Sequence, residues 1–247
     1  MYGTMLQLSI AGTRSTVDME KPELILLTEG TDPHKVLFLV QGYTSDKDSH
    51  PTAFVHEVQA LQSIGWHGSI YLLWWNASRS SAPLHRTIPP AHWHIVKHRA
   101  KQTGVKYFTE IINQVQDKEI SIIAHSLGVR LVYYGLLTLD SSQFKVRDVI
   151  LFGGAIRRNK KEWPVVVQNI RGKLYNFYNR DDDVLHFIYK AAELRTHSPC
   201  GRKPIEVDHP NIYNINLTGV FKKRKVNNHT GYWTILTDIL RSEQWPE

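Results

Sequence analysis

A chain of 247 residues with 42% hydrophobic and 11% aromatic residues can build a large core, which excludes global disorder. Its single cysteine, Cys200, excludes an internal disulfide and a cysteine-based zinc site, and it suits a reducing, cytoplasmic setting. The formal net charge of +7 favours an anionic partner or a soluble basic surface, but no nucleic-acid motif accompanies it, so nucleic-acid binding is not expected.

The organisation of the chain is simple. No linker rich in proline, glycine or serine divides it, so the sequence predicts one domain over residues 1–247. No signal-peptide pattern follows Met1, and the longest apolar runs have the length of strands, so we expect a soluble protein.

The first third of the chain predicts three kinds of element. Two short strands over about residues 6–10 and 24–28 are expected to form an antiparallel edge of a sheet. The apolar run 35–40 predicts a buried strand, and a loop beginning at Gln41-Gly42-Tyr43 follows it. A helix over about 52–64 and a strand over 69–75 come next.

A long polar connection, residues 76–93, is expected to form a wall of the substrate site, because long loops in compact domains are usually functional or disordered. His94 and His98 stand at i, i+4, but no acidic residue lies between them as it does in the zinc motif of metalloproteases. We therefore expect no metal. A helix over about 95–116 closes this part of the chain.

The stretch 118–137 changes from strand to helix. Residues 120–124 are mostly β-branched, whereas Leu127, Leu131 and Tyr134 recur at helical spacing. The turn between them reads Ala124-His125-Ser126-Leu127-Gly128, which resembles the Gly-x-Ser-x-Gly nucleophile elbow with alanine at its first position. The alternative is that Ser126 only caps the helix, as serine often does.

The last third continues the alternation of strands and helices. Strands are predicted over 146–152, 173–179 and 212–217, and helices over 163–170, 184–194 and 233–241; residues 222–225 form a basic turn. Only a short helix follows the strand at 146–152, which leaves little room for a lid. This alternation predicts an α/β fold with a mostly parallel sheet and helices on both faces.

A serine hydroxyl needs a general base, and the base needs a residue that orients it. Ser126, one of the three aspartates at 181–183, and His229 each follow a different strand, in the chain order of α/β-hydrolases. Among the 13 histidines, His209 precedes the last strand and falls at the opposite edge, while His125 adjoins Ser126 on the elbow and points away from it. The alternative for His229 is a surface histidine before a helix.

The chain resembles an α/β-hydrolase, and in particular a poorly characterised branch typified by transmembrane and coiled-coil domain proteins. The resemblance lies in the elbow, in the segment 178–189 and in His229-Thr230-Gly231-Tyr232-Trp233. It implies that Ser126, Asp182 and His229 form a catalytic triad, with Asp183 as the cap of the following helix. It does not identify a substrate, and the membrane-spanning helices of typical members are not expected here.

Further site residues follow from the predicted strand ends. The main-chain N–H groups of Leu127 and Tyr43 are expected to form the oxyanion hole. Gly42, His125 and Trp93 are expected to contact the substrate. We expect no cofactor.

Three functional hypotheses follow from the sequence. The first is a serine hydrolase of carboxylic esters, which could be lipids; the second is an inactive binding module with the same fold; the third is a basic nucleic-acid-associated protein. The basic segment 221–225 lies between the last strand and His229. It predicts a peripheral contact with an anionic membrane, whereas a solvated loop is the simpler alternative.

Overall fold

The computed structural model describes residues 20–43, 52–77, 90–115, 117–140, 146–192 and 197–246. The strand predicted over 6–10 and most of the polar connection, residues 78–89, lie outside these ranges. The strands are β1 (Glu23–Thr28), β2 (Asp32–Val40), β3 (Gly68–Trp74), β4 (Glu119–His125), β5 (Val146–Phe152), β6 (Leu174–Tyr178) and β7 (Ile212–Asn216).

The helices connect these strands along the chain. They are η1 (Thr52–Phe54), α1 (Val55–Ser63), α2 (Pro90–Asn113), α3 (Leu127–Leu136), α4 (Trp163–Gln168), α5 (Asp183–Ala192), α6 (Thr218–Arg224), α7 (Gly231–Thr234) and α8 (Leu236–Ser242). Helix α4 lies between β5 and β6 and has six residues.

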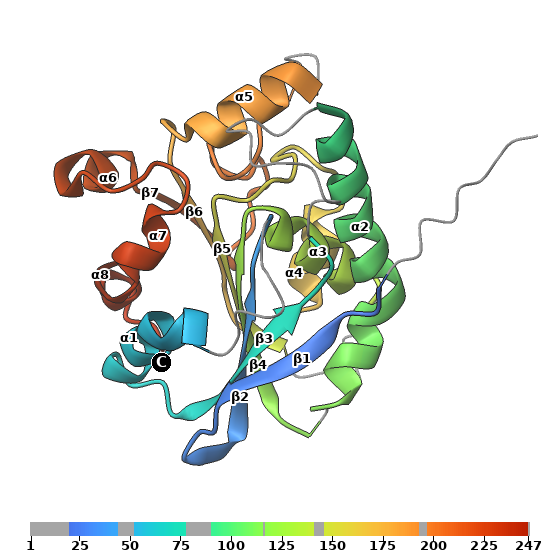
Figure 1. Ribbon diagram of the computed structural model, residues 1–247, viewed down its shortest axis with the longest axis vertical. Helices are drawn as coiled ribbons and strands as arrows, with labels where there is room; N and C mark the ends of the chain where they lie inside the picture. The colour runs from blue at the N-terminus through green and yellow to red at the C-terminus, as the bar shows by residue number, and fades with distance from the viewer. Residues whose placement is uncertain are drawn as a thin grey trace, which may run out of the picture.

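The described strands form one twisted sheet in the order β1-β3-β2-β4-β5-β6-β7 (Figure 1). All neighbours pair in parallel except β1 and β3, so the antiparallel edge predicted for residues 24–28 is confirmed. β2, β4 and β5 lie inside the sheet, and their apolar runs are buried on both faces, as a parallel sheet covered by helices requires.

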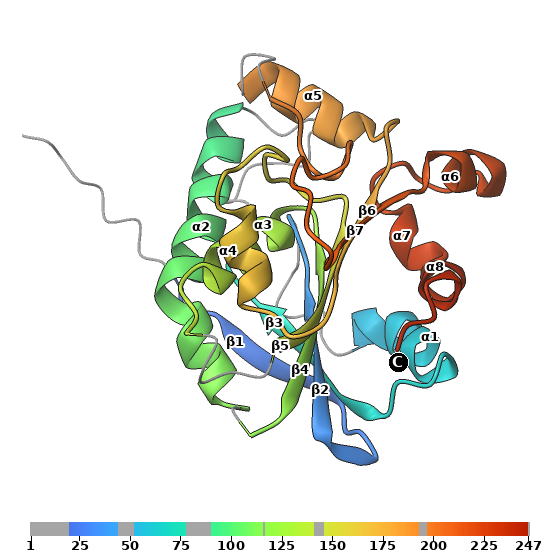
Figure 2. The ribbon, with the colours of Figure 1, turned by 180° about the vertical axis from the view of Figure 1, so that it is seen from behind.

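Helices cover both faces of the sheet. Figures 1 and 2 show α2, α3 and α4 on one face and α1, α7 and α8 on the other. Each face has its own hydrophobic core: Phe108, Leu131 and Trp163 are buried on the first side, and Leu61, Tyr232 and Leu240 on the second. Because the central strands are parallel, their carboxyl ends meet at one edge of the sheet, where ligands bind in folds of this kind.

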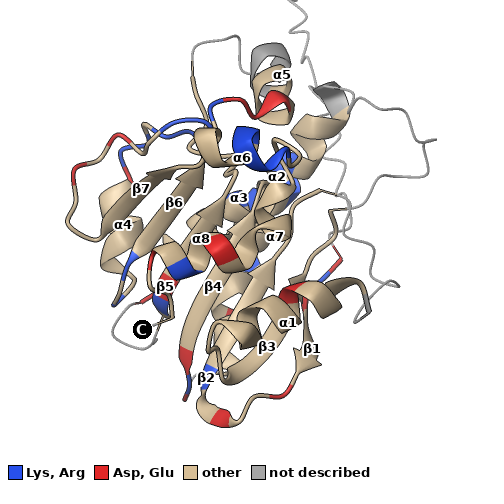
Figure 3. Cartoon of the chain, turned by 90° about the vertical axis from the view of Figure 1, so that its left-hand side faces the viewer, with Lys and Arg blue, Asp and Glu red and all other residues tan. Residues whose placement is uncertain are grey.

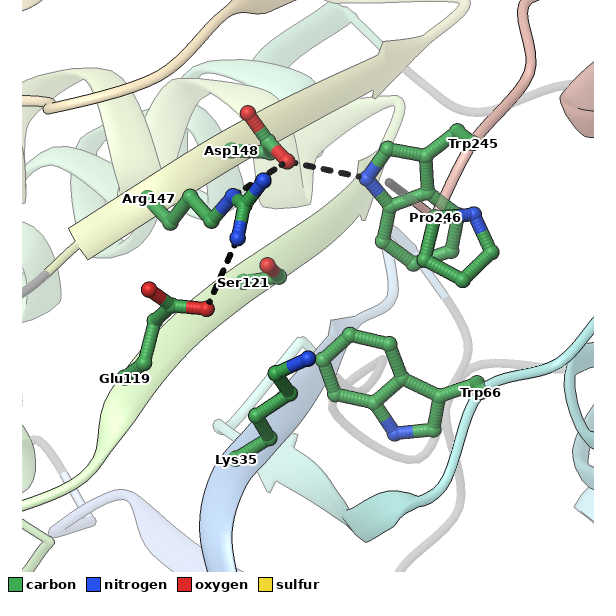
Figure 4. A pocket seen from close by; sticks show the side chains of 8 residues that line it. All are labelled: Lys35, Trp66, Glu119, Ser121, Arg147, Asp148, Trp245 and Pro246. Carbon is green, nitrogen blue, oxygen red and sulfur yellow. Dashed lines mark hydrogen bonds and ion pairs between the residues drawn. The ribbon is translucent and has the colours of Figure 1, made fainter. Parts of the chain in front are cut away.

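The amino ends of the strands hold a small polar pocket, drawn in Figure 4. Trp245, near the carboxyl end of the chain, stacks on Trp66 with 5.4 Å between ring centroids. Its Nε1 donates a hydrogen bond of 3.1 Å to Asp148, whose other carboxylate oxygen accepts one from the main chain of Lys173. Arg147 forms ion pairs with Asp148 and Glu119. We call this group the amino-end pocket.

Three sequence predictions need correction. Helix α2 begins at Pro90 and not near residue 95, because proline suits the first turn of a helix. The cations at 222–224 belong to helix α6 and not to a turn, with Phe221 as its buried anchor. The predicted last helix is two short helices, α7 and α8, separated at Ile235, where φ is −116°.

Candidate active site

Ser126 occupies the sharp turn between β4 and α3. Its φ of 54° and ψ of −117° are rare for a residue with a side chain, and such strain persists only where surrounding contacts impose it. Two of these contacts come from β5 and the segment after it: the N–H of Ser126 donates to Phe152 O, and its carbonyl accepts from Ala155 N–H, both at 3.0 Å. The serine therefore stands on a strained strand-to-helix turn.

The elbow depends on two close backbone approaches. A Cβ atom on Gly128 would lie 2.3 Å from Val40 O, and one on Gly42 would lie 2.7 Å from Ser126 Cβ, so neither position has room for a side chain. Ala124, which stands at the elbow's usual first glycine, is fully buried in the core, where its methyl group packs. The departure from the motif is therefore accommodated.

Ser126, His229 and Asp182 lie in one hydrogen-bonded line at the carboxyl edge of the sheet. His229 Nε2 is 3.0 Å from Ser126 Oγ, and His229 Nδ1 is 2.7 Å from Asp182 Oδ2. All three side chains are buried. The structure thus brings together three residues that are 47 and 103 positions apart in sequence. His209 lies elsewhere, before β7, where its Nδ1 accepts from Asn211 N–H.

Asp182 has a second structural task. Its Oδ1 accepts a hydrogen bond of 2.8 Å from Leu185 N–H, three residues on, which is the geometry of a helix N-cap. The expectation that Asp183 caps this helix was therefore wrong: Asp183 is the first residue of α5 and bonds only locally to Val184 N–H. Asp181 and Asp183 are exposed, and Asp182 alone of the three is buried.

Of the predicted oxyanion-hole residues, Leu127 follows Ser126 directly, and Tyr43 follows Gly42, which packs against Ser126. Leu127 begins α3, so its N–H belongs to the free donors of a helix N-terminus. The loop carrying Gly42 and Tyr43 passes directly against it, since a Cβ on Gly42 would be 3.2 Å from Leu127 N. Trp75 Nε1 donates to Gln41 O at 2.9 Å and holds this loop.

Two predicted substrate contacts have other positions. Helix α2 starts earlier than expected, so Trp93 lies on this helix and not in a loop. Its side chain is buried in the core. His125 is also buried, and its Nε2 is 2.9 Å from the main-chain oxygen of His229. Burial, and secondarily the charge of His229, lowers the pKa of His125 to about 3. His125 thus stands beneath the proposed base as a neutral ring.

Sequence reasoning missed Asn179. This residue follows β6, is fully buried, and donates from Nδ2 to Asn228 O in the loop before His229. A signal existed in the sequence, because a polar amide stands directly after a buried strand and three residues before Asp182.

Within the part of the chain that the structure describes, no group of three or more His, Cys, Asp or Glu side chains lies close enough to hold a metal ion. His94 and His98 are exposed on α2. None of the described helices is long and apolar enough to cross a membrane.

The strand order, the antiparallel edge strand and the serine elbow between β4 and α3 define the α/β-hydrolase fold. Within this class, the chain belongs to the family described as "Protein of unknown function (DUF726)", which matches residues 85–245.

Two curated relatives carry names that mention membranes. The chain is 30% identical over 157 residues to "Uncharacterized membrane protein F35D11.3" of Caenorhabditis elegans, covering 61% of this chain and 24% of that protein. It is 25% identical over 152 residues to "Transmembrane and coiled-coil domain-containing protein STS1" of rice (Oryza sativa subsp. japonica), covering 60% and 22%. The chain therefore spans about a quarter of the length of these relatives.

Solved structures with a similar fold include esterases. The catalytic core of acetyl xylan esterase from Trichoderma reesei matches with a TM-score of 0.47 and 11% identity, over 86% of this chain and 97% of that chain. Pyrococcus furiosus esterase Pf2001 matches with a TM-score of 0.40 and 13% identity, over 90% and 92%.

Proposed function

We propose that the protein is a serine hydrolase that cleaves carboxylic esters through Ser126, His229 and Asp182. The observation that carries the proposal is the line of hydrogen bonds of 3.0 and 2.7 Å from the strained serine through His229 to Asp182. A serine that only caps its helix needs no imidazole at its oxygen. No cap hydrogen bond from the Ser126 side chain is present in α3.

The residues have distinct roles in the proposed reaction. Asp182 accepts Nδ1–H of His229 and fixes the tautomer that leaves Nε2 free to take a proton. Nε2 takes the proton of Ser126 as Oγ forms a bond to the ester carbonyl carbon. The negative charge that develops on the carbonyl oxygen is stabilised by N–H groups at the start of α3 and in the loop around Tyr43.

The intermediate then collapses and the cycle closes. The bond from the carbonyl carbon to the alcohol oxygen breaks, and the alcohol leaves with the proton that His229 received. Water attacks the resulting acyl-serine, and His229 takes one of its protons and returns it to Ser126 Oγ. The products are a carboxylic acid, an alcohol and the free enzyme, so no cofactor is consumed.

The test is covalent labelling with a fluorophosphonate probe. Wild type should form a stoichiometric adduct on Ser126, and Ser126→Ala and His229→Gln should not, because both remove a group needed for attack. Absence of labelling in folded wild type would favour the alternative, a binding module with the same fold. Thermal unfolding of the variants checks that folding is retained.

We also propose that α6 brings this face of the protein to anionic lipid head groups. Lys222, Lys223 and Lys225 are exposed, and Figure 3 draws the cations of α6 in blue. Arg224 is paired with Asp238, so the three lysines carry the proposal. The helix follows β7 and precedes His229, so a lipid surface bound there would lie near Ser126. The helix dipole also favours cations in this last turn, which is the simpler account.

A further inference from the structure

The loop that carries His229, residues 227–230, is held by two buried side chains from outside it. His125 Nε2 is 2.9 Å from His229 O, and Asn179 Nδ2 is 2.9 Å from Asn228 O. Two consecutive main-chain carbonyls of one short loop thus each meet a side-chain nitrogen. One nitrogen comes from the serine elbow and the other from the turn that carries the acid.

His125 has the chemistry of a fixed donor. Its ring is buried among the rings of His229, Tyr232 and Trp233, with centroids 4.9, 6.1 and 5.9 Å away. The lowered pKa means that the ring is neutral, so it carries one N–H, and a carbonyl acceptor requires that N–H at Nε2. His125 therefore donates to His229 O and ties the loop to the end of β4.

Asn179 connects the same loop to the acid. Besides donating to Asn228 O, it accepts a hydrogen bond of 3.0 Å from Asp181 N–H at Oδ1. Its main-chain oxygen accepts from Asp182 N–H at 3.2 Å. One fully buried amide thus binds the acid turn and the histidine loop together.

We propose that His125 and Asn179 are positioning residues that hold His229 between Ser126 and Asp182. The inference deepens the proposed function and rests on it for its effect on rate. The histidine loop follows α6 and is not part of the sheet, so strand pairing does not fix its distance from the other two residues. A displacement of about 1 Å in a catalytic group can cost about a hundredfold in rate.

The test uses variants that remove or keep each donor. His125→Phe keeps an aromatic ring against Tyr232 and Trp233 but removes the N–H, whereas His125→Gln keeps an N–H donor. Asn179→Ala removes the second donor. The matched control is Asn176→Ala: Asn176 is also a fully buried asparagine, three residues earlier, and it donates to Asn214 Oδ1 in β7 and not to the histidine loop.

The first readout is the rate of fluorophosphonate labelling. We expect His125→Phe and Asn179→Ala to slow labelling by about ten- to a hundredfold, with His125→Gln and Asn176→Ala within a few-fold of wild type. Thermal unfolding separates this effect from lost stability. Labelling of both donor-less variants at the wild-type rate, or an equal loss in Asn176→Ala, would overturn the proposal.

The second readout does not require activity. The proton that His229 Nδ1 shares with Asp182 gives a downfield proton resonance when the ring is held, and His229→Gln identifies that resonance by its loss. We expect the resonance to broaden or disappear in His125→Phe and Asn179→Ala and to persist in Asn176→Ala. If wild type is not labelled but this pattern holds, the proposed hydrolase activity fails while the positioning role stands. An unchanged resonance in both donor-less variants refutes the positioning role.

Discussion

The two ends of the sheet each bury an aspartate, and they differ in what the aspartate meets. At the carboxyl end, Asp182 accepts from a main-chain N–H and from an imidazole that leads to a serine hydroxyl. At the amino end, Asp148 accepts from a main-chain N–H and from the indole of Trp245, and it forms an ion pair with Arg147. An indole N–H neither titrates nor transfers a proton near neutral pH. The partner, rather than the buried carboxylate, therefore distinguishes the proposed active site from the aspartate at the amino end.

The largest expected effect compares these two aspartates directly. Asp182→Asn should lower ester hydrolysis, measured with p-nitrophenyl acetate, by about four orders of magnitude, because the amide no longer fixes the working tautomer of His229. An asparagine at 182 can still cap α5. Asp148→Asn should leave the rate within a few-fold of wild type. Equal losses in both variants would contradict the distinction between Asp182 and Asp148. A comparable loss in Asp181→Asn or Asp183→Asn would assign the role of the acid to that residue instead.

The amino end should respond in stability and not in rate. Trp245→Phe keeps the stacking on Trp66 but leaves one oxygen of Asp148 without its indole donor. We expect a loss of about 1–3 kcal/mol in the free energy of unfolding. Urea denaturation measures it, and fluorophosphonate labelling at the wild-type rate is the control. A slower labelling rate in a stably folded variant would link the two ends and break the comparison.

The elbow end should carry an acid sensitivity that comes from His125. The pKa of His125 is lowered to about 3 in the folded protein, and the titratable groups that face it are His229 and Tyr232. Between pH 6.5 and about pH 3, the unfolded chain binds a proton at His125 that the folded protein does not bind. The free energy of unfolding therefore falls as the pH falls.

The matched variant is His125→Gln, which cannot titrate. Relative to it, the wild-type free energy of unfolding should fall more steeply with decreasing pH, by about 1.4 kcal/mol per unit between about pH 6 and 4. Denaturant titrations across this range measure the difference. Parallel curves for the two proteins would mean that His125 is not held neutral.

The smallest expected effect concerns α6. If Lys222, Lys223 and Lys225 contact anionic lipid, each change to Gln should weaken binding to phosphatidylserine vesicles by about 1 kcal/mol. High salt should also weaken this binding, because it screens the charges. Lys118→Gln, at the amino end of β4, is the control. Co-sedimentation that is equal for anionic and zwitterionic vesicles would leave α6 as a solubilising helix.

Chain order and local pattern predicted most of the sheet, Ser126 and His229, whereas the family resemblance selected Asp182 among the three aspartates. The β-branched run before Ser126 and the helical spacing after it are local signals, and the order of Ser126, Asp182 and His229 follows from the alternation of elements. What failed depends on tertiary contacts. The position of Trp93 required the start of α2, which the weak apolar pattern of that helix concealed.

The main-chain partners of His125 and Asn179 could not be predicted from sequence for a related reason, although the place of Asn179 after a buried strand was a signal. Both donate to main-chain carbonyls of a loop distant in sequence, and a carbonyl leaves no mark on residue identity. Asp182 was assigned to His229, but its second role as helix cap was given to Asp183. One carboxylate has two oxygens and can do both tasks: in the structure, Oδ1 of Asp182 accepts from Leu185 N–H and Oδ2 meets His229 Nδ1.

The backbone conformation of Ser126 makes the chain less stable with serine at this position than with glycine. A φ of 54° with a side chain costs about 1–3 kcal/mol, and glycine at the same position avoids that cost. Ser126→Gly should therefore unfold at a higher temperature than wild type while losing the hydroxyl. A chain that did not need its nucleophile would become more stable by discarding it, so the serine at this turn lowers stability in a way that only a use for its hydroxyl would offset.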